Sequence, residues 1–514
     1  MYLAGPFSGR FVDKHGPRLP LLAASVLLLV GYSGMRSIFS AGLPEGTDSL
    51  SNFKLIVLVL CSFMTGVGGN AGLITAINTS AKTFPDRIRG STTGMVISGF
   101  GLSALFFSAL SHLVTAGDTA SFLLLLALGS SFPMILGFFF ARPIPLHATE
   151  EDTAFTRRQS EVDYTEVDGV ALAPSVLSHH DNDSRTHLLS HDRDDENDVE
   201  EGRVSIELNP PRPVSPRLPE SNPSLSHERR RRRSSSVRAT LTSVEAGPNL
   251  FGKKLFASSD FWLLVCILSL LSGTGLMYIN NVGSMSRALF VHEAKNSTLS
   301  DQDQVDIVKW QAAQVSTISF MNFSGRLFIG FFSDFVKARL GQPRSFLLVL
   351  VSFLVLLSQI TAMTVDRLED LWKASTLLGL GYGTVFSLFA ALCVEWFGLA
   401  HFSENWGYLS LAPLLGGNVF SVAFGRNLDA HEKAASPGPT SDTNILDAPR
   451  PPKEIQCLDG KTCYVDSIRL TTVACLVAMG LSIWAAWRDR KRHYKEAQNT
   501  ADSRPDIVWE ADES

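Results

Sequence analysis

The sequence predicts an all-α polytopic membrane protein, a two-half helical bundle with about ten spans, and three observations lead to this class. Long apolar runs recur outside residues 142–255, although the mean hydropathy of the 514-residue chain is only +0.13. About 20 consecutive apolar residues suffice to cross a bilayer. More than a third of the charged residues fall within 142–255, and motifs repeat between the two flanking parts. A single soluble globular domain is therefore excluded.

Ten apolar stretches predict the membrane-spanning helices. They lie near 19–40, 54–78, 92–115, 120–141, 260–282, 307–332, 345–364, 373–397, 406–425 and 468–487. Glycine is frequent inside them, and in lipid it lets helix backbones approach closely, which favours a tightly packed bundle. The predicted organisation is an N-terminal membrane half at 1–141, a disordered linker at 142–255, a C-terminal membrane half at 256–490 and a tail at 491–514.

Lysine and arginine predict the orientation of the spans. They cluster at 10–18, 82–89, 337–344 and 488–492, which all fall on one side if the helices alternate. Such an excess marks the cytoplasmic side, so the linker and the C-terminus should be cytoplasmic. The net charge of −5 gives no reason to expect nucleic acid as a partner. The expected partners are membrane lipid and a small-molecule solute, and a monomer is expected.

The N-terminal residues 1–8 are apolar but too short to span a bilayer. They lack the basic start and the long apolar core of a signal peptide. We interpret them as the last turns of a helix whose beginning is absent.

One motif occurs twice with a large offset, which indicates two parallel halves. Its members are Gly9, Asp13, Gly16 and Arg18 in the first copy and Gly330, Asp334, Lys337 and Arg339 in the second. A glycine-rich stretch at 66–72 recurs at 379–385, and residues 84–90 have a weaker counterpart at 397–407. We expect Asp13 and Asp334 to hold a cytoplasmic gate, by bonding to a helix terminus or a basic neighbour, and to release it during rocking.

These two copies resemble the loop signature of the major facilitator superfamily, found between helices two and three and between helices eight and nine. By that resemblance the first helix and most of the second are missing here, and a truncated gene model is the preferred explanation. Residues 273–281, Gly325 with Arg326, and residues 397–402 resemble nodulin-like and fungal monocarboxylate-transporter-homologue permeases. The resemblance implies a secondary carrier for a small organic solute, in particular a monocarboxylate, with the vacuolar membrane favoured over the plasma membrane.

Arg326 is the most informative single side chain. It lies roughly 11 Å deep in an otherwise apolar span, at 1.5 Å per residue, and charge at that depth is costly. One interpretation is an anion-binding guanidinium whose fork suits a carboxylate. The other is that it snorkels or braces Asp334 at the gate. The resembling carriers have an Arg at the same spacing before the glycine but an Asp where this chain has Asn322, so a coupling proton stays an open question.

Further substrate-binding candidates are polar residues within the apolar spans. Tyr278, Asn280 and Asn281 cluster in the first helix after the linker, and they either bind substrate or bond across helices, because amides in a bilayer need partners. Asn70, Tyr382 and Asn418 are weaker candidates of the same kind, and packing roles are favoured for them.

The remaining candidates lie in the polar segments. Cys457 and Cys463 share one exofacial loop, for which we predict a disulfide in an oxidising or lumenal space. Asn296 begins a glycosylation sequon on the same side. In the linker, five arginines precede Ser234, Ser235 and Ser236. The linker is interpreted either as solvated chain or as an anionic-lipid contact that is released when these serines are phosphorylated.

No enzyme signature is present in the sequence. There is no phosphate-binding G-x-x-x-x-G-K-[ST] run, no metal-ligand spacing and no Rossmann fingerprint, so neither a cofactor nor a metal is expected. The favoured function is transport by alternating access. Two alternatives are a non-transporting sensor or receptor on a carrier fold, and an inactive truncated carrier.

Overall fold

The computed structural model describes residues 2–42, 51–114, 118–141, 249–294, 300–431, 457 and 459–502. Within these ranges the chain is helical and has no strand. Nine of the helices described there are long and apolar enough to cross a membrane. The protein is thus a multi-pass, all-α membrane protein, and the predicted fold class is confirmed.

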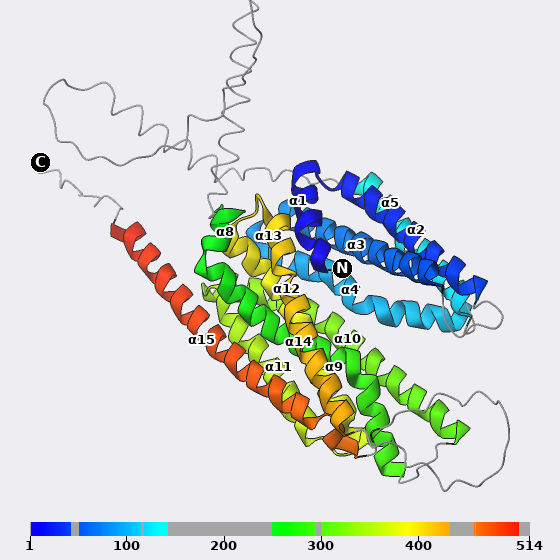
Figure 1. The fold of residues 1–514 in the computed structure, drawn as a ribbon. Coiled ribbons are helices and arrows are strands. Elements are labelled where there is room, and N and C mark those ends of the chain that lie inside the picture. Colours follow the sequence, from blue (N-terminus) through cyan, green and yellow to red (C-terminus); the bar gives the residue numbers. More distant parts are fainter. Residues whose placement is uncertain are drawn as a thin grey trace, which may run out of the picture. The chain divides into compact units, whose positions relative to one another are not determined.

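The N-terminal half (blue to cyan in Figure 1) holds four of the apolar helices. Its elements are η1 (Tyr2–Ala4), α1 (Gly5–His15), α2 (Arg18–Ala41), α3 (Asn52–Thr83), α4 (Asp86–Val114) and α5 (Thr119–Phe140). Helix α2 packs against α3 and α5. Asp118 caps the start of α5, and its hydrogen bonds from the hydroxyl and backbone N–H of Ser121 and from the N–H of Ala120 hold its pKa below the ordinary value.

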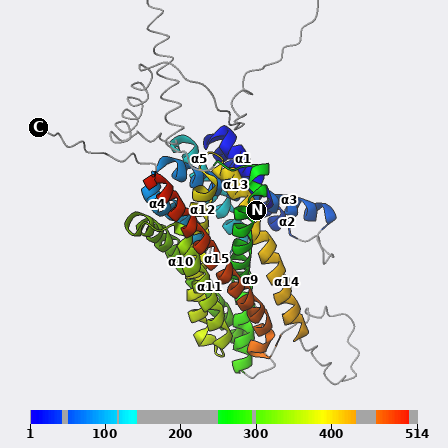
Figure 2. The same ribbon diagram turned by 90° about the vertical axis from the view of Figure 1, so that its left-hand side faces the viewer.

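The C-terminal half (green to red in Figure 1) is arranged around α12. Its elements are α8 (Lys253–Ala257), α9 (Ser259–Ala294), α10 (Asp301–Leu340), η2 (Arg344–Phe346), α11 (Leu347–Thr364), η3 (Leu368–Asp370), α12 (Leu371–Phe397), α13 (Phe402–Leu409), α14 (Ala412–Ala430), η4 (Gly460–Cys463) and α15 (Val465–Asp502). Helix α12 packs against α9, α10 and α11. In its most apolar 18-residue stretch, 83% of the residues are buried. Figure 2 shows α9, α11, α14 and α15 running side by side.

Two predicted spans differ in detail from the observed helices. The span at 307–332 lies within α10, whose 40 residues extend about 60 Å, but α10 is not one of the nine apolar helices. Polar residues such as Gln311 and Gln314 lower its hydropathy. The span at 406–425 is divided between α13 and α14, and Pro413 lies in the first turn of α14, where a missing N–H is tolerated.

The repeated motif lies largely within helices, and its first copy also runs through the link between α1 and α2. Helix α1 continues to His15 and α10 to Leu340, so both copies lie largely within the last turns of a helix. In the second copy α10 runs unbroken from Gly330 to Arg339, whereas in the first copy α1 ends before Arg18, the residue that begins α2. Each helix ends at the next glycine that adopts a positive φ, Gly16 at 74° and Gly341 at 59°.

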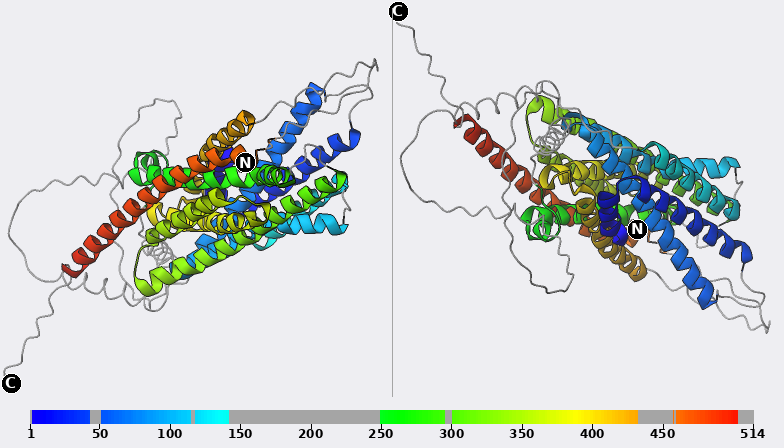
Figure 3. Two further views of the ribbon diagram at one scale, coloured as in Figure 1. Left: turned by 90° about the horizontal axis from the view of Figure 1, so that it is seen from below. Right: turned by 90° about the horizontal axis from the view of Figure 1, so that it is seen from above.

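The two halves meet along two seams, in which helices of opposite halves pack directly together. One seam joins α1 to α13 and the other joins α4 to α10. Figure 3, in which the molecule is seen from below and from above, also shows helices of the two halves side by side. The last turns of α15 (red) extend past its neighbours in Figures 1 and 3, so this helix continues beyond the predicted boundary at 490.

Candidate functional site

Arg326 lies at the seam between α4 and α10, with only 1% of its surface exposed. Its Nε donates to Oδ1 of Asn322 at 3.0 Å, and its Nη1 donates to the backbone carbonyl of Ile97 in α4 at 2.7 Å. Arg326 therefore neither snorkels toward water nor pairs with Asp334. It connects the two halves from a buried position.

Aromatic side chains surround the Arg326 guanidinium. Its Cζ lies 5.1 Å from the ring centroid of Phe100 and 5.6 Å from that of Phe386, distances typical of cation–π contacts. The ring of Tyr382 packs against that of Phe386, with ring centroids 5.1 Å apart, so Tyr382 belongs to the same aromatic cluster. In the part of the chain that the structure describes, no acidic side chain forms an ion pair with Arg326.

Tyr278 and Asn281 lie away from this guanidinium and have partners of their own. The hydroxyl of Tyr278 is 3.0 Å from that of Ser375, which donates in turn to Gln314 at 2.7 Å. This buried chain joins α9, α12 and α10. The amide of Asn281 donates to the carbonyl of Met277 in its own helix. Of the two interpretations, the geometry favours bonding within the bundle.

The other predicted polar candidates separate into three environments. Tyr382 packs on Gly275, as the predicted packing role requires. It also lies beside the Arg326 cluster, so it has a second set of contacts. Asn70 is 3% exposed, and its amide nitrogen has no hydrogen-bond partner. Asn280 and Asn418 are exposed, and the amide of Asn418 donates to Leu414 of its own helix. Only Tyr382 joins Arg326 in one site.

The second motif copy holds the start of α4. The carboxylate of Asp334 accepts hydrogen bonds from the backbone N–H groups of Gly90 and Ser91, at 3.0 and 2.6 Å, and from the Ser91 hydroxyl at 2.6 Å. A carboxylate at a helix N-terminus also interacts favourably with the helix dipole. On its other side Asp334 pairs with Arg344 at 2.9 Å.

The first motif copy makes the equivalent contact in the opposite direction. The carboxylate of Asp13 accepts from the backbone N–H of Glu404 in the first turn of α13, at 2.8 Å, and pairs with Lys82 at 3.2 Å. Each half thus grips the start of a helix in the other half. Of the remaining motif members, Gly9 and Gly330 lie against the opposite half, whereas Arg18 and Arg339 are exposed.

Arg344 is the centre of this charged region, although nothing in its sequence context indicates that role. Its guanidinium is buried and contacts three carboxylates, Asp334 at 2.9 Å, Asp86 at 3.2 Å and Glu395 at 3.3 Å. Lys337 adds contacts of 2.7 Å to Asp86 and 3.6 Å to Glu395. In sequence Arg344 is one more basic residue between two spans, and only the tertiary fold identifies it.

Glycines allow the α4–α10 seam to close. A Cβ added at Gly94 would lie 2.8 Å from the carbonyl oxygen of Arg326 and 3.1 Å from the Cα of Gly330, so the two backbones are in direct contact. Gly99 belongs to the same helix, but a Cβ there would meet no atom within 4 Å.

We expect Gly94→Ala to destabilise the protein by about 1–3 kcal/mol, because the methyl group overpacks rigid backbone. Gly99→Ala serves as the matched control and should be neutral or stabilising by up to about 1 kcal/mol. Thermal unfolding of both purified variants measures the difference. Equal midpoints for the two variants would show that the seam is not tightly packed in solution.

Of the features predicted in the polar segments, the disulfide lies within the described residues, whereas the glycosylation sequon and the linker serines do not. Cys457 and Cys463 form a disulfide at the start of α15, where both are buried. Asn296 and the three serines Ser234, Ser235 and Ser236 lie outside the described residues, as does most of the predicted linker. Residues from 249 onward pack on the C-terminal half, since the N–H of Leu250 donates to Phe397 and its carbonyl accepts from Asn405.

Two helical halves built on a repeated motif are an arrangement found in many polytopic membrane transporters. A family model for the Major Facilitator Superfamily matches residues 1–421. The chain belongs to the Major Facilitator Superfamily, a family of secondary transporters, and the resemblance stated from its motifs is confirmed.

Named relatives are similar over most of the chain. A probable transporter mch1 of Neurospora crassa is 25% identical over 95% of this chain and 81% of its own length. An uncharacterized membrane protein of Saccharomyces cerevisiae is 24% identical over 84% and 78%. The oxalate:formate antiporter of Oxalobacter formigenes is 33% identical over 23% and 25%. The solved proton:xylose symporter XylE has a TM-score of 0.49 at 12% identity, covering 92% of this chain and 82% of its own.

Proposed function

We propose that the protein transports a small organic anion, in particular a monocarboxylate, by alternating access, and that Arg326 binds the carboxylate. One observation carries this proposal. A guanidinium that is 1% exposed lies between the two halves with no acidic partner among the described residues. A buried charge without a counter-ion is costly, so an anionic solute would complete the site.

The donors of Arg326 suit a carboxylate. A guanidinium has five N–H donors, and the hydrogen bonds to described residues use Nε and Nη1. Its planar fork matches the two oxygens of a carboxylate. Phe100, Phe386 and Tyr382 supply apolar surface for a short hydrocarbon part. The name of the Oxalobacter formigenes relative, an oxalate:formate antiporter, supports a small carboxylate as the solute.

The two seams support alternating access. Asp13 and Asp334 close equivalent contacts at the end of the bundle that the basic clusters predict to be cytoplasmic. Opening toward that side would break both contacts, whereas opening toward the other side would leave them intact. The structure would then correspond to a carrier closed on the cytoplasmic side. The vacuolar membrane stays a prediction.

Uptake into proteoliposomes tests the proposal. We expect saturable uptake of labelled lactate or pyruvate, above the level in protein-free liposomes, that excess unlabelled monocarboxylate inhibits and a sugar does not. Thermal stabilisation by the same solutes is measured in parallel. Stabilisation without uptake would indicate the sensor, and absence of both for every small carboxylate would overturn the proposal.

A further inference from the structure

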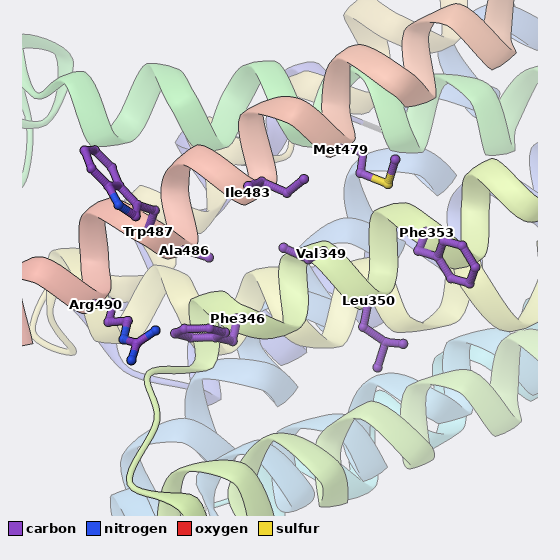
Figure 4. A pocket seen from close by; sticks show the side chains of 9 residues that line it. All are labelled: Phe346, Val349, Leu350, Phe353, Met479, Ile483, Ala486, Trp487 and Arg490. Carbon is purple, nitrogen blue, oxygen red and sulfur yellow. The ribbon is translucent and has the colours of Figure 1, made fainter.

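A groove of about 620 Å³ lies between α11 and α15, away from the site of Arg326. Eight of the nine side chains that line it are apolar, and the ninth is Arg490 (Figure 4). Phe353, Ile483 and Trp487 are each about half exposed. The groove therefore opens on the surface of the C-terminal half, where a membrane protein meets lipid.

The groove has a polar end and an apolar end. Phe346, Trp487 and Arg490 lie at one end, and Phe353 and Met479 lie at the other (Figure 4). Along α15, the eleven residue-to-residue steps from Met479 to Arg490 rise about 16 Å. Because the hydrocarbon core of a bilayer is about 30 Å thick, this length corresponds to one leaflet.

The two helices are joined beneath the groove. The hydroxyls of Ser352 and Ser482 lie 2.8 Å apart, and the Ser345 hydroxyl donates to Asp489. All four side chains are buried. The small side chain of Ala486 lies between these contacts and leaves room above it. These hydrogen bonds hold α11 and α15 at a fixed distance. The groove between them is therefore not a gap that would close if the helices moved together.

Arg490 differs from the basic residues next to it. Arg488 and Arg492 both pair with Asp260, at 2.6 Å each. Arg490 is exposed and forms no ion pair with any residue that the structure describes. Nearby, the Nζ of Lys491 lies 3.6 Å from the ring centroid of Trp487, and tryptophan is typical of the membrane interface. An unneutralised cation therefore stands at the interfacial mouth of an apolar groove.

We propose that this groove binds one acyl chain of an anionic phospholipid whose net-negative headgroup pairs with Arg490. The apolar lining matches the chain, and the positive charge of the guanidinium matches the net negative charge of the headgroup. The polar end lies where the basic cluster at 488–492 predicts the cytoplasmic side, and the cytoplasmic leaflet carries the anionic lipids. The site is separate from the solute site, so it stands independently of the transported substrate.

Native mass spectrometry of the full-length protein, titrated with phosphatidylserine or phosphatidylcholine, tests the site. A basic residue near an anionic lipid surface contributes about 1 kcal/mol, so we expect an approximately five-fold preference for phosphatidylserine. Arg490→Gln should remove this preference. The matched control is Lys495→Gln, an exposed cation five residues further along α15 that does not line the groove, and it should keep the preference.

Ile483→Trp fills the groove from an exposed position and should weaken retention of both lipids while the unfolding midpoint stays unchanged. Retention of the full phosphatidylserine preference by Arg490→Gln would overturn the proposal. So would undiminished lipid retention by Ile483→Trp.

Discussion

Replacing Arg326 by lysine should lower monocarboxylate uptake about 100-fold while expression stays normal. A lysine keeps the positive charge but loses the planar fork, so it cannot bind a carboxylate through two parallel hydrogen bonds. It also cannot reach Asn322, Ile97 and a solute at once. A hydrogen bond to a charged group contributes about 1.5–3 kcal/mol, and each 1.4 kcal/mol changes an equilibrium tenfold. The initial uptake rate in proteoliposomes measures the loss.

A matched control distinguishes binding from general damage. Arg469→Lys changes an exposed arginine that pairs with Asp466 within one turn of α15, and uptake should stay at the wild-type level. Thermal unfolding with and without solute adds a second readout. We expect the Arg326 variant to lose the solute-induced stabilisation that the wild type shows. Unchanged uptake by Arg326→Lys would exclude the substrate role of this residue.

Replacing Arg344 by glutamine should cause the largest loss of stability, about 3–5 kcal/mol. Removing one partner of a buried ion pair leaves the remaining charges uncompensated. Here Asp334, Asp86 and Glu395 would lose their shared guanidinium, and Asp334 is almost fully buried. Lys337 contacts Asp86 and Glu395, but it does not replace the bond to Asp334. Chemical unfolding of the purified variant in detergent measures the change.

Arg367→Gln provides the comparison for this variant. Arg367 is exposed at the opposite end of α11, and its replacement should change stability by no more than about 0.5 kcal/mol. Arg344→Lys should recover part of the loss, because it restores the charge without the fork. If Arg344→Gln unfolded at the same denaturant concentration as Arg367→Gln, the buried charge cluster would not stabilise the seam.

The fold was predictable because span length and hydropathy are local properties. Helix α12 illustrates this, since its predicted range 373–397 differs by two residues from Leu371–Phe397. For the seams, the sequence predicted that Asp13 and Asp334 bond to a helix terminus or a basic neighbour, and their role as a gate stays a prediction. Asp334 accepts a hydrogen bond from Gly90, a residue more than 240 positions away in sequence. This contact depends on how the two halves pack. The same holds for Arg344.

The candidate site was predictable only in part for a similar reason. Arg326 stood out because charge within an apolar span is rare. The sequence ranked Tyr278, which clusters with Asn280 and Asn281, above Tyr382, for which a packing role was favoured. One bonds to Ser375 inside its own half, and the other reaches the Arg326 cluster. Which face of a helix a residue occupies, and what packs on that face, separates the two.

The hydrogen bonds that Asp13 and Asp334 each form to a helix of the opposite half have a consequence for solute affinity. In the proposed alternating-access cycle, the contacts of Asp13 and Asp334 close the same side, so they would act in parallel on a single opening equilibrium. A solute shifts such an equilibrium only by the difference between its affinities for the two states. Any free energy that stabilises the closed seams must therefore be matched by an equal gain in binding free energy in the state whose seams are open. Strong seams would therefore lower the apparent affinity for a solute that enters from the cytoplasmic side, because the state open to that side would be rarely populated.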